Sequence, residues 1–354
     1  MNRYASLDPD GPLGPEFRLI GRLAAELGAG EAPLPTDVAA RLREGLGDDA
    51  ALWDIGGGLT GILTVDTMVA GVHAFDHEPG EAVGARALTA AASDVCAMGG
   101  IPRLALVALQ LPRETGEEKL EALYRGLREE ADALQLAVVG GDVVDTPGPL
   151  SISITVYGEV AETGIWRRSG ARPGDLVLVS GSLGGSRAGV ELLARGPDAP
   201  RRGWAAELVE RHLRPRARVD TVRALAGAGE VHAAIDISDG LSSEAWHLAL
   251  DSGVSLVLEA SHIPLHPALR SFMEWLDPTG DEAGAVLYAL DSGEEFELLL
   301  TCGPDHPALA GNDSQSGVPL TVIGRVEGGE PTVVLEGAGA TRTISAGGWS
   351  HRGG

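Results

Sequence analysis

Residues 150–160 have the sequence LSISITVYGEV, in which apolar and polar side chains alternate strictly from Ser151 to Tyr157. Alternation of this kind predicts a strand of an antiparallel sheet, with one face on the core and the other facing water or a partner. The other elements predicted in this half are helices at residues 17–27, 81–98 and 117–134 and strands at residues 61–66, 104–111 and 136–139. Together they predict an α+β domain that ends near residue 160.

The pattern starts again after a basic turn at residues 166–175, WRRSGARPGD. Strands are predicted at residues 176–179, 233–237, 254–258, 297–300 and 320–326, with helices between them. This predicts a second α+β domain of similar size. The predicted organisation is therefore a two-domain α+β fold, with domains at residues 1–160 and 161–354.

The composition excludes several classes of partner. The chain has 51 acidic and 27 basic side chains, and its formal charge of −24 repels phosphate backbones and anionic lipid. We therefore expect no nucleic-acid partner and no membrane, and no apolar run approaches the ~18 residues that a membrane span needs. The two cysteines form no C-x-x-C pair and the first residues lack a signal-peptide pattern, so the predicted location is the cytoplasm.

The chain contains a single lysine, Lys119, in a segment with helical spacing. A Walker A loop needs a lysine directly after its glycines, so a P-loop is excluded. A lysine that forms Schiff bases needs an apolar pocket, and a charged helix face does not supply one. Positive charge in this protein therefore comes almost entirely from arginine.

Six acidic sites follow or interrupt apolar runs. They are Asp48 with Asp49, Asp66, Asp94, Asp142, Asp236 and Asp239. A carboxylate at the end of a buried strand is unfavourable unless it is paired, protonated or bound to metal. Oxygen ligands without nearby Cys or His favour a hard cation, and Mg²⁺ is the usual choice beside phosphates. A helix cap or a turn is the alternative for any single Asp, but the repetition favours a metal cluster.

Other segments supply candidate anion sites. Gly140 and Gly141 precede Asp142 at a predicted strand end, where backbone N–H groups could approach a phosphate. Residues 180–189, SGSLGGSRAG, predict a strand, a turn and a helix N-terminus for an anion, with tight turn packing as the alternative. Arg168 is a candidate phosphate clamp or a solvated turn residue. His73 is a candidate ligand contact or a structural histidine.

Taken in order, several segments resemble the thiamine-monophosphate kinases, a family of the aminoimidazole ribonucleotide synthetase-like superfamily. The segments are GLGDDAAL, TVDTMVAGVH, ASDVCAMGG, VVGGDVV, RRSGARPGD, RHLRPRAR, IDISDGL and SGEEFEL. The resemblance runs from about Phe17 to Trp349. It implies transfer of the γ-phosphoryl group of ATP to thiamine monophosphate, which gives thiamine diphosphate and ADP. It also implies several Mg²⁺ ions and a homodimer in which the N-terminal domains pair their sheets.

The resemblance also implies roles for individual residues. The implied magnesium ligands are Asp48, Thr64, Val65, Asp66, Asp94, Asp142, Asp236 and Asp239. The implied nucleotide contacts are Tyr124, Gly141, Asp142, Arg168 and Ser238, and the implied substrate contacts are His73, Glu294 and Trp349. Asp66, Asp142 and Arg168 are the implied catalytic residues. Val65 stands where the family usually has Ser or Thr, which leaves a backbone carbonyl as the ligand, and Glu295 replaces an Asp.

The predicted mechanism is in-line attack by a phosphate oxygen of the substrate on the γ-phosphorus of ATP. A phosphate is already ionised at neutral pH, so no general base and no phospho-enzyme are required. The alternatives are another ATP-dependent enzyme of the superfamily, such as a selenophosphate or aminoimidazole ribonucleotide synthetase, or a non-catalytic protein that binds Mg-nucleotide. A selenophosphate synthetase needs a reactive residue near the N-terminus, whereas the first cysteine here is Cys96.

Overall fold

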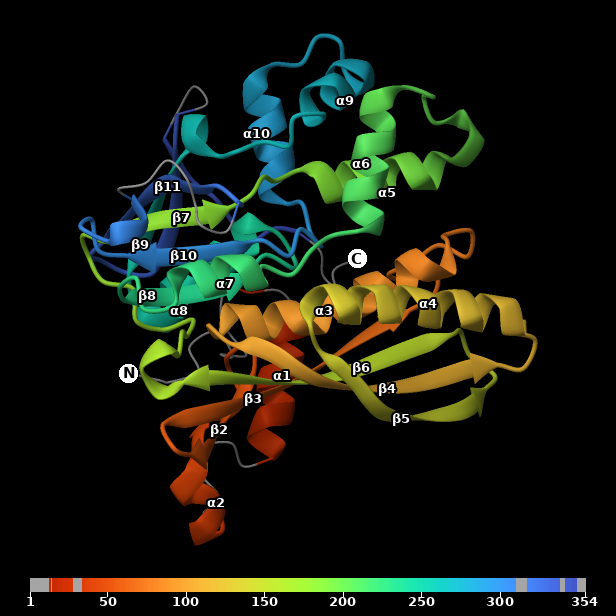
Figure 1. Ribbon diagram of the computed structural model, residues 1–354. Helices are drawn as coiled ribbons and strands as arrows, with labels where there is room; N and C mark the ends of the chain where they lie inside the picture. Colours follow the sequence, from red (N-terminus) through yellow and green to blue (C-terminus); the bar gives the residue numbers. More distant parts are fainter. Residues whose placement is uncertain (1–12, 14, 28–33, 310–316, 338–340, 349–354) are drawn as a thin grey trace.

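The computed structural model describes residues 13, 15–27, 34–309, 317–337 and 341–348. These residues form two sheets with helices packed between and around them (Figure 1). No helix in these ranges combines the length and the apolar character that are needed to cross a bilayer.

The first sheet has the strand order β1-β2-β3-β6-β4-β5. Its strands are β1 (Leu42–Glu44), β2 (Ala51–Gly56), β3 (Leu59–Val69), β4 (Ile101–Pro112), β5 (Ala137–Thr146) and β6 (Ser151–Ala161). Neighbouring strands are antiparallel except β4 and β5, which run parallel. A parallel pair needs a crossover, and the helix α4 (Glu117–Leu134) provides it.

The predicted alternation of β6 is confirmed by its burial, because every second side chain from Ile152 to Val160 is buried. Those side chains face α4 and the helix α3 (Gly80–Ala97), which cover one face of the sheet (Figure 1). The helices approach so closely that a Cβ atom at Gly84 would lie 2.0 Å from the carbonyl oxygen of Leu123.

The opposite face of the first sheet carries exposed apolar side chains. Leu63 and Val65 of β3 are 52% and 63% exposed, and Leu104 and Leu106 of β4 are 41% and 47% exposed. Leu63 and Leu104 both pair with Tyr157, and Val65 and Leu106 both pair with Thr155, so the four side chains share one face. We call this the outer face of the first sheet.

The second sheet has the strand order β13-β12-β9-β11-β7-β10-β8. Its strands are β7 (Leu176–Ser180), β8 (Val231–Asp236), β9 (Ser255–Glu259), β10 (Leu298–Cys302), β11 (Leu320–Glu327), β12 (Thr332–Glu336) and β13 (Arg342–Thr343). The other α-helices are α1 (Pro15–Glu26), α2 (Thr36–Arg41), α5 (Gly185–Arg195), α6 (Gly203–Leu213), α7 (Val219–Leu225), α8 (Leu241–Ser252), α9 (Leu269–Leu276) and α10 (Glu282–Leu290).

Helix α3 is the middle layer of the molecule, because it contacts β3 and β6 on one side and β8 and α6 on the other. Its alanine-rich sequence lets it be buried on nearly all sides. Val95 of α3 belongs to the same apolar cluster as Leu178 and Leu298 of the second sheet, so the core continues from one half of the chain into the other.

Two details differ from the expected organisation. Leu13 and Phe17 pack into the core of the second half, although the boundary near residue 160 assigns them to the first domain. The Gly140-Gly141-Asp142 segment was expected at a strand end, but β5 continues to Thr146, so that expectation was wrong. β5 is an edge strand, and its residues before and after the two glycines are exposed. The sequence therefore has no change in hydrophobic pattern that marks the end of the strand.

Candidate functional site

A cavity of about 690 Å³ lies between the two halves of the molecule. Its walls come from β3 and the loop that follows it, from α3, α5 and α6, and from the ends of β8 and α10. The cavity brings together many of the residues singled out from the sequence: Val65, Asp66, His73, Asp94, Asp236, Ser238, Asp239 and Glu294. Trp349 lies outside the described residues.

Three carboxylates form a compact group at this cavity. Asp49 precedes β2, Asp94 lies on α3 and Asp236 ends β8, and one oxygen from each lies within 4.8 Å of the other two. The group joins the two halves of the chain, because Ser93 Oγ on α3 donates a 2.7 Å hydrogen bond to Asp236 Oδ2. Thr64 Oγ1 on β3 donates a 2.6 Å hydrogen bond to Asp94 Oδ2.

Burial and mutual repulsion make the ionised form of these carboxylates unfavourable in the protein alone. Burial and the neighbouring Asp49 carboxylate together raise the pKa of Asp236 to about 7. Burial also raises the pKa of Asp94 well above its ordinary value, with Asp236 and Asp66 adding to the effect. Asp49 Oδ2 is buried without a hydrogen-bond partner. Crowded, partly unsatisfied carboxylate oxygens fit a hard divalent cation such as Mg²⁺.

Arg168 lies beside the group and holds the Asp48–Asp49 turn. Its Nε donates a 3.0 Å hydrogen bond to Asp49 Oδ1, and Nη2 donates to the same oxygen. Although burial opposes it, the neighbouring Asp49 carboxylate raises the pKa of Arg168. When the three carboxylates are ionised, one guanidinium beside them leaves an excess of negative charge.

The resemblance implied Asp48 as a metal ligand, but the structure places its neighbour Asp49 in the carboxylate group. Both oxygens of Asp48 accept hydrogen bonds from the Arg168 backbone N–H, at 3.3 and 3.2 Å. The sequence shows two adjacent aspartates before β2 and cannot tell which of them faces α3. Ser93 was also missed, although it directly precedes Asp94.

A second acidic edge of the cavity is built by the loop after β8. Glu244 of α8 accepts a 2.9 Å hydrogen bond from the Asp239 backbone N–H and a 3.4 Å hydrogen bond from Ser238 Oγ. Burial raises the pKa of Asp239 to about 7. Burial and the Asp239 charge raise the pKa of Glu244 well above its ordinary value. Glu244 thus fixes the loop that carries two predicted site residues, and it was not predicted.

Asp142 is not part of this carboxylate group. Asp142 pairs with Ala108, and Ala108 pairs with Ser153, which places Asp142 three strands away from β3. This row reaches β3 at Thr67, next to Asp66, and at about 4.8 Å per strand Asp142 lies roughly 14 Å from there. Asp66 pairs with the buried Ile154, so its side chain and that of Asp142 leave the sheet on opposite faces.

The remaining nucleotide candidates lie elsewhere too. Gly141 sits on β5 beside Val107 of β4. Tyr124 is 42% exposed on α4 and does not line the cavity. The segment at residues 180–189 does form a strand, a turn and a helix, but protein groups occupy the helix N-terminus. Glu295 Oε1 accepts a 3.1 Å hydrogen bond from the Ser186 N–H, the second residue of α5, so the tight-packing alternative fits better than an anion site.

The sequence matches the model described as AIR synthase related protein, N-terminal domain, over residues 47–160, and the corresponding C-terminal domain over residues 172–336. The thiamine-monophosphate kinase of Bacillus subtilis is 35% identical over 311 residues, which cover 87% of this chain and 93% of the relative. That of Aquifex aeolicus is 37% identical over 290 residues, which cover 82% and 87%. The chain belongs to the thiamine-monophosphate kinase family. The predicted family is confirmed.

Solved structures agree with the family. The structure described as "AaThiL complexed with AMPPCP and TMP" has a TM-score of 0.79 at 34% identity, and the match covers 95% of this chain and 96% of that one. A thiamine-monophosphate kinase from Stenotrophomonas maltophilia has a TM-score of 0.71 at 33% identity, with 92% and 98% covered. The hydrogenase maturation protein HypE, at 21% identity and a TM-score of 0.67, shares the fold alone. The predicted two-domain α+β fold is thus confirmed.

Proposed function

We propose that the protein transfers the γ-phosphoryl group of ATP to thiamine monophosphate and releases thiamine diphosphate and ADP. The proposal rests on one observation. In a chain of this family, the carboxylates Asp94 and Asp236 line the same cavity as His73 and Glu294. Relatives named thiamine-monophosphate kinase and a related structure with AMPPCP and TMP support the same reaction.

Asp49, Asp94 and Asp236 would hold Mg²⁺, with Asp66 and Asp239 lining the same cavity. When bound, the ions neutralise charge on the transferred phosphoryl group. We propose Asp49 ahead of Asp48 as the ligand, because Asp48 is engaged by the Arg168 backbone. Thr64 and Ser93 orient two of the carboxylates through the hydrogen bonds described above.

The protein's own side chains position the two substrates. Arg168 places a guanidinium beside the three-carboxylate group. Because the protein has no P-loop lysine, this guanidinium would supply the positive charge that binds phosphate. Glu294 offers a carboxylate to the cationic acceptor, and His73 lines the same cavity. The attacking oxygen belongs to an ionised phosphate, so catalysis depends on alignment and charge stabilisation rather than on proton removal.

We further propose that the protein works as a homodimer through the outer face of the first sheet. Leu63, Val65, Leu104 and Leu106 form an exposed apolar surface there, and contiguous apolar surface of this kind marks an interaction site. Asp142 lies on the same side of the sheet. Asp66 and Asp142 are too far apart in one chain to bind one ion, so Asp142 would contribute to the site of the partner.

The decisive experiment is incubation of the protein with Mg-ATP and thiamine monophosphate, with thiamine diphosphate measured by chromatography. Unphosphorylated thiamine is the control acceptor, and we expect no product from it. Binding of both substrates without turnover would instead support a non-catalytic nucleotide-binding protein. Labelled ATP alone should leave no phosphate on the protein, and a trapped phospho-enzyme would contradict direct transfer.

A further inference from the structure

Arg86 of α3 is fully buried beneath the cavity, and the mechanism above does not use it. Its Nη2 donates a 2.7 Å hydrogen bond to the carbonyl oxygen of His73 and lies 2.9 Å from Glu78 Oε2. Its Nη1 lies 2.6 Å from Nε2 of His212, which belongs to α6 in the other half of the chain. A buried guanidinium is unfavourable without such partners, so the contacts of Nη1 and Nη2 hold its position, while Arg86 Nε makes no hydrogen bond.

The contact with Arg86 determines the tautomer of His212. Burial and the Arg86 charge lower the pKa of His212 to about 2, so the ring is neutral. Arginine only donates, so Nε2 of His212 accepts and Nδ1 carries the proton. Nδ1 lies 3.2 Å from Ser186 Oγ and 3.5 Å from Glu294 Oε2. The N–H group on Nδ1 of His212 therefore contacts the Ser186 hydroxyl and lies next to the Glu294 carboxylate.

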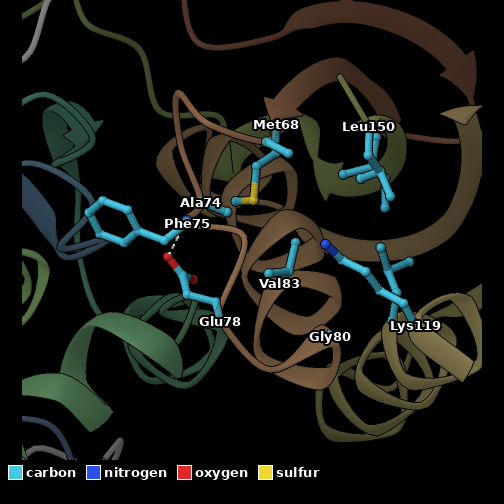
Figure 2. A pocket seen from close by; sticks show the side chains of 11 residues that line it. Met68, Ala74, Phe75, Glu78, Gly80, Val83, Lys119 and Leu150 are labelled. Carbon is cyan, nitrogen blue, oxygen red and sulfur yellow. Dashed lines mark hydrogen bonds between the residues drawn. The ribbon is translucent and has the colours of Figure 1, made fainter. Parts of the chain in front are cut away.

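Arg86 also anchors the loop that follows β3. The loop turns at Gly71, whose φ of +80° suits glycine, and its N–H donates to the Ala74 carbonyl oxygen at 2.7 Å. Glu78 accepts a 2.8 Å hydrogen bond from the Phe75 N–H, which Figure 2 shows as a dashed line. Arg86 thus reaches the loop twice, through the His73 carbonyl and through Glu78.

Glu294 needs such support because its backbone is unusual. Its φ is +52°, in the left-handed region that a side chain rarely adopts. Its N–H donates a 2.6 Å hydrogen bond to the Ser238 carbonyl oxygen, which ties it to the loop after β8. Its carboxylate faces His212, and Arg86 Nε lies 3.9 Å away.

We propose that Arg86 and His212 are positioning residues that set the geometry of the acceptor substrate, because together they fix His73 and Glu294 across the boundary between the two halves. This inference rests on the proposed function, in which His73 and Glu294 contact thiamine monophosphate. The proposed nucleotide residue Arg168 and the three-carboxylate group make their contacts independently of this network. Loss of the network therefore affects acceptor binding and spares ATP.

The first test compares steady-state kinetics of the wild type and the double variant Arg86→Met/Glu78→Gln. The second substitution avoids leaving a buried, unpaired carboxylate. We expect the KM for thiamine monophosphate to rise roughly tenfold or more, with the KM for ATP within about twofold of the wild type. The matched control is Arg218→Met/Glu297→Gln, an ion pair between a half-buried arginine and a buried glutamate that does not line the cavity. The control should keep both KM values.

A second pair of variants separates positioning from simple packing. His212→Asn keeps an N–H donor near the Nδ1 position, and His212→Gln keeps a polar group near Nε2 only. We expect His212→Gln to raise the KM for thiamine monophosphate roughly tenfold and His212→Asn to raise it about threefold or less. A structural role alone would change the melting temperature and affect the two variants alike.

The outcomes distinguish the two levels of the proposal. If the wild type forms no thiamine diphosphate, the proposed function itself is contradicted. If the wild type is active and the Arg86 double variant keeps a normal KM for thiamine monophosphate, the positioning role is refuted while the function stands. An equal rise of both KM values, or equal effects of the two His212 variants, would also overturn it.

Discussion

Replacing Asp236 by Asn should stabilise the metal-free protein and abolish most of its activity. Burial raises the pKa of Asp236 to about 7 in the fold, whereas a free Asp has a pKa of about 3.9. The folded state therefore holds the proton more tightly, and metal-free stability falls as the pH rises from about 4 to about 7. At about 1.4 kcal/mol per pKa unit, ionised Asp236 costs the fold up to roughly 4 kcal/mol. The amide removes this cost.

The assay is thermal unfolding in EDTA at about pH 8, followed by the same measurement with excess Mg²⁺. We expect Asp236→Asn to raise the Tm in EDTA by roughly 5 °C or more. Added Mg²⁺ should then raise the Tm of the wild type much more than that of the variant. The variant should also lose roughly two orders of magnitude in kcat, since a ligand of the ion is missing.

Asp145→Asn is the control, because the Asp145 side chain is 71% exposed at the end of β5. It should change neither the Tm in EDTA nor the response to Mg²⁺. The reasoning is refuted if Asp236→Asn melts at or below the wild-type temperature in EDTA and still responds normally to Mg²⁺. The carboxylate group would then be a stabilising polar cluster and not a cation site.

Asp66→Asn and Asp142→Asn should each lower kcat by roughly two orders of magnitude, and near-normal turnover in either variant would contradict its role. If Asp142 acts in the partner's site, mixing the two inactive variants should restore roughly a quarter of wild-type activity after subunit exchange, and no recovery would place both residues in one chain's site. Leu106→Arg should give monomers in light scattering, whereas an unchanged mass would remove the outer face as the interface. Glu295→Leu should lower the free energy of unfolding by roughly 2 kcal/mol or more in urea titrations, because the Ser186 N–H and the Ser292 hydroxyl would both lose their buried acceptor; an unchanged midpoint would show that the acceptor is not needed.

Much of the fold was predictable because its elements have strong local patterns. The alternation in β6 and the helical spacing of α3 and α4 are visible in the sequence, and the structure has these elements within one or two residues of the predicted bounds. The packing of Leu13 and Phe17 on the second half was not predictable. An amphipathic pattern indicates that a helix buries one face, but it does not indicate which part of the protein covers that face.

The candidate site was predictable in its chemistry and less so in its geometry. Repeated aspartates at strand ends indicated a cation site, and Asp94 and Asp236 do meet. The choice between Asp48 and Asp49 depends on a turn that Arg168 holds from a distant segment. The role of Arg86 was not predictable either, because its partners are distant in sequence. A single arginine in an alanine-rich helix does not indicate that it contacts residues 73 and 212.

Asp142 shows what a single chain cannot reveal about a site. Its sequence context resembles that of Asp66, yet the two side chains leave opposite faces of one sheet, roughly 14 Å apart. Ligands of one Mg²⁺ ion lie within about 4 Å of each other, because each is about 2.1 Å from the metal. A second sheet packed on the outer face would cover the exposed Leu63 and Leu106 and bring a new set of side chains to Asp142. The same contact would thus account for an exposed apolar face and for an acidic residue that is remote from its expected partners.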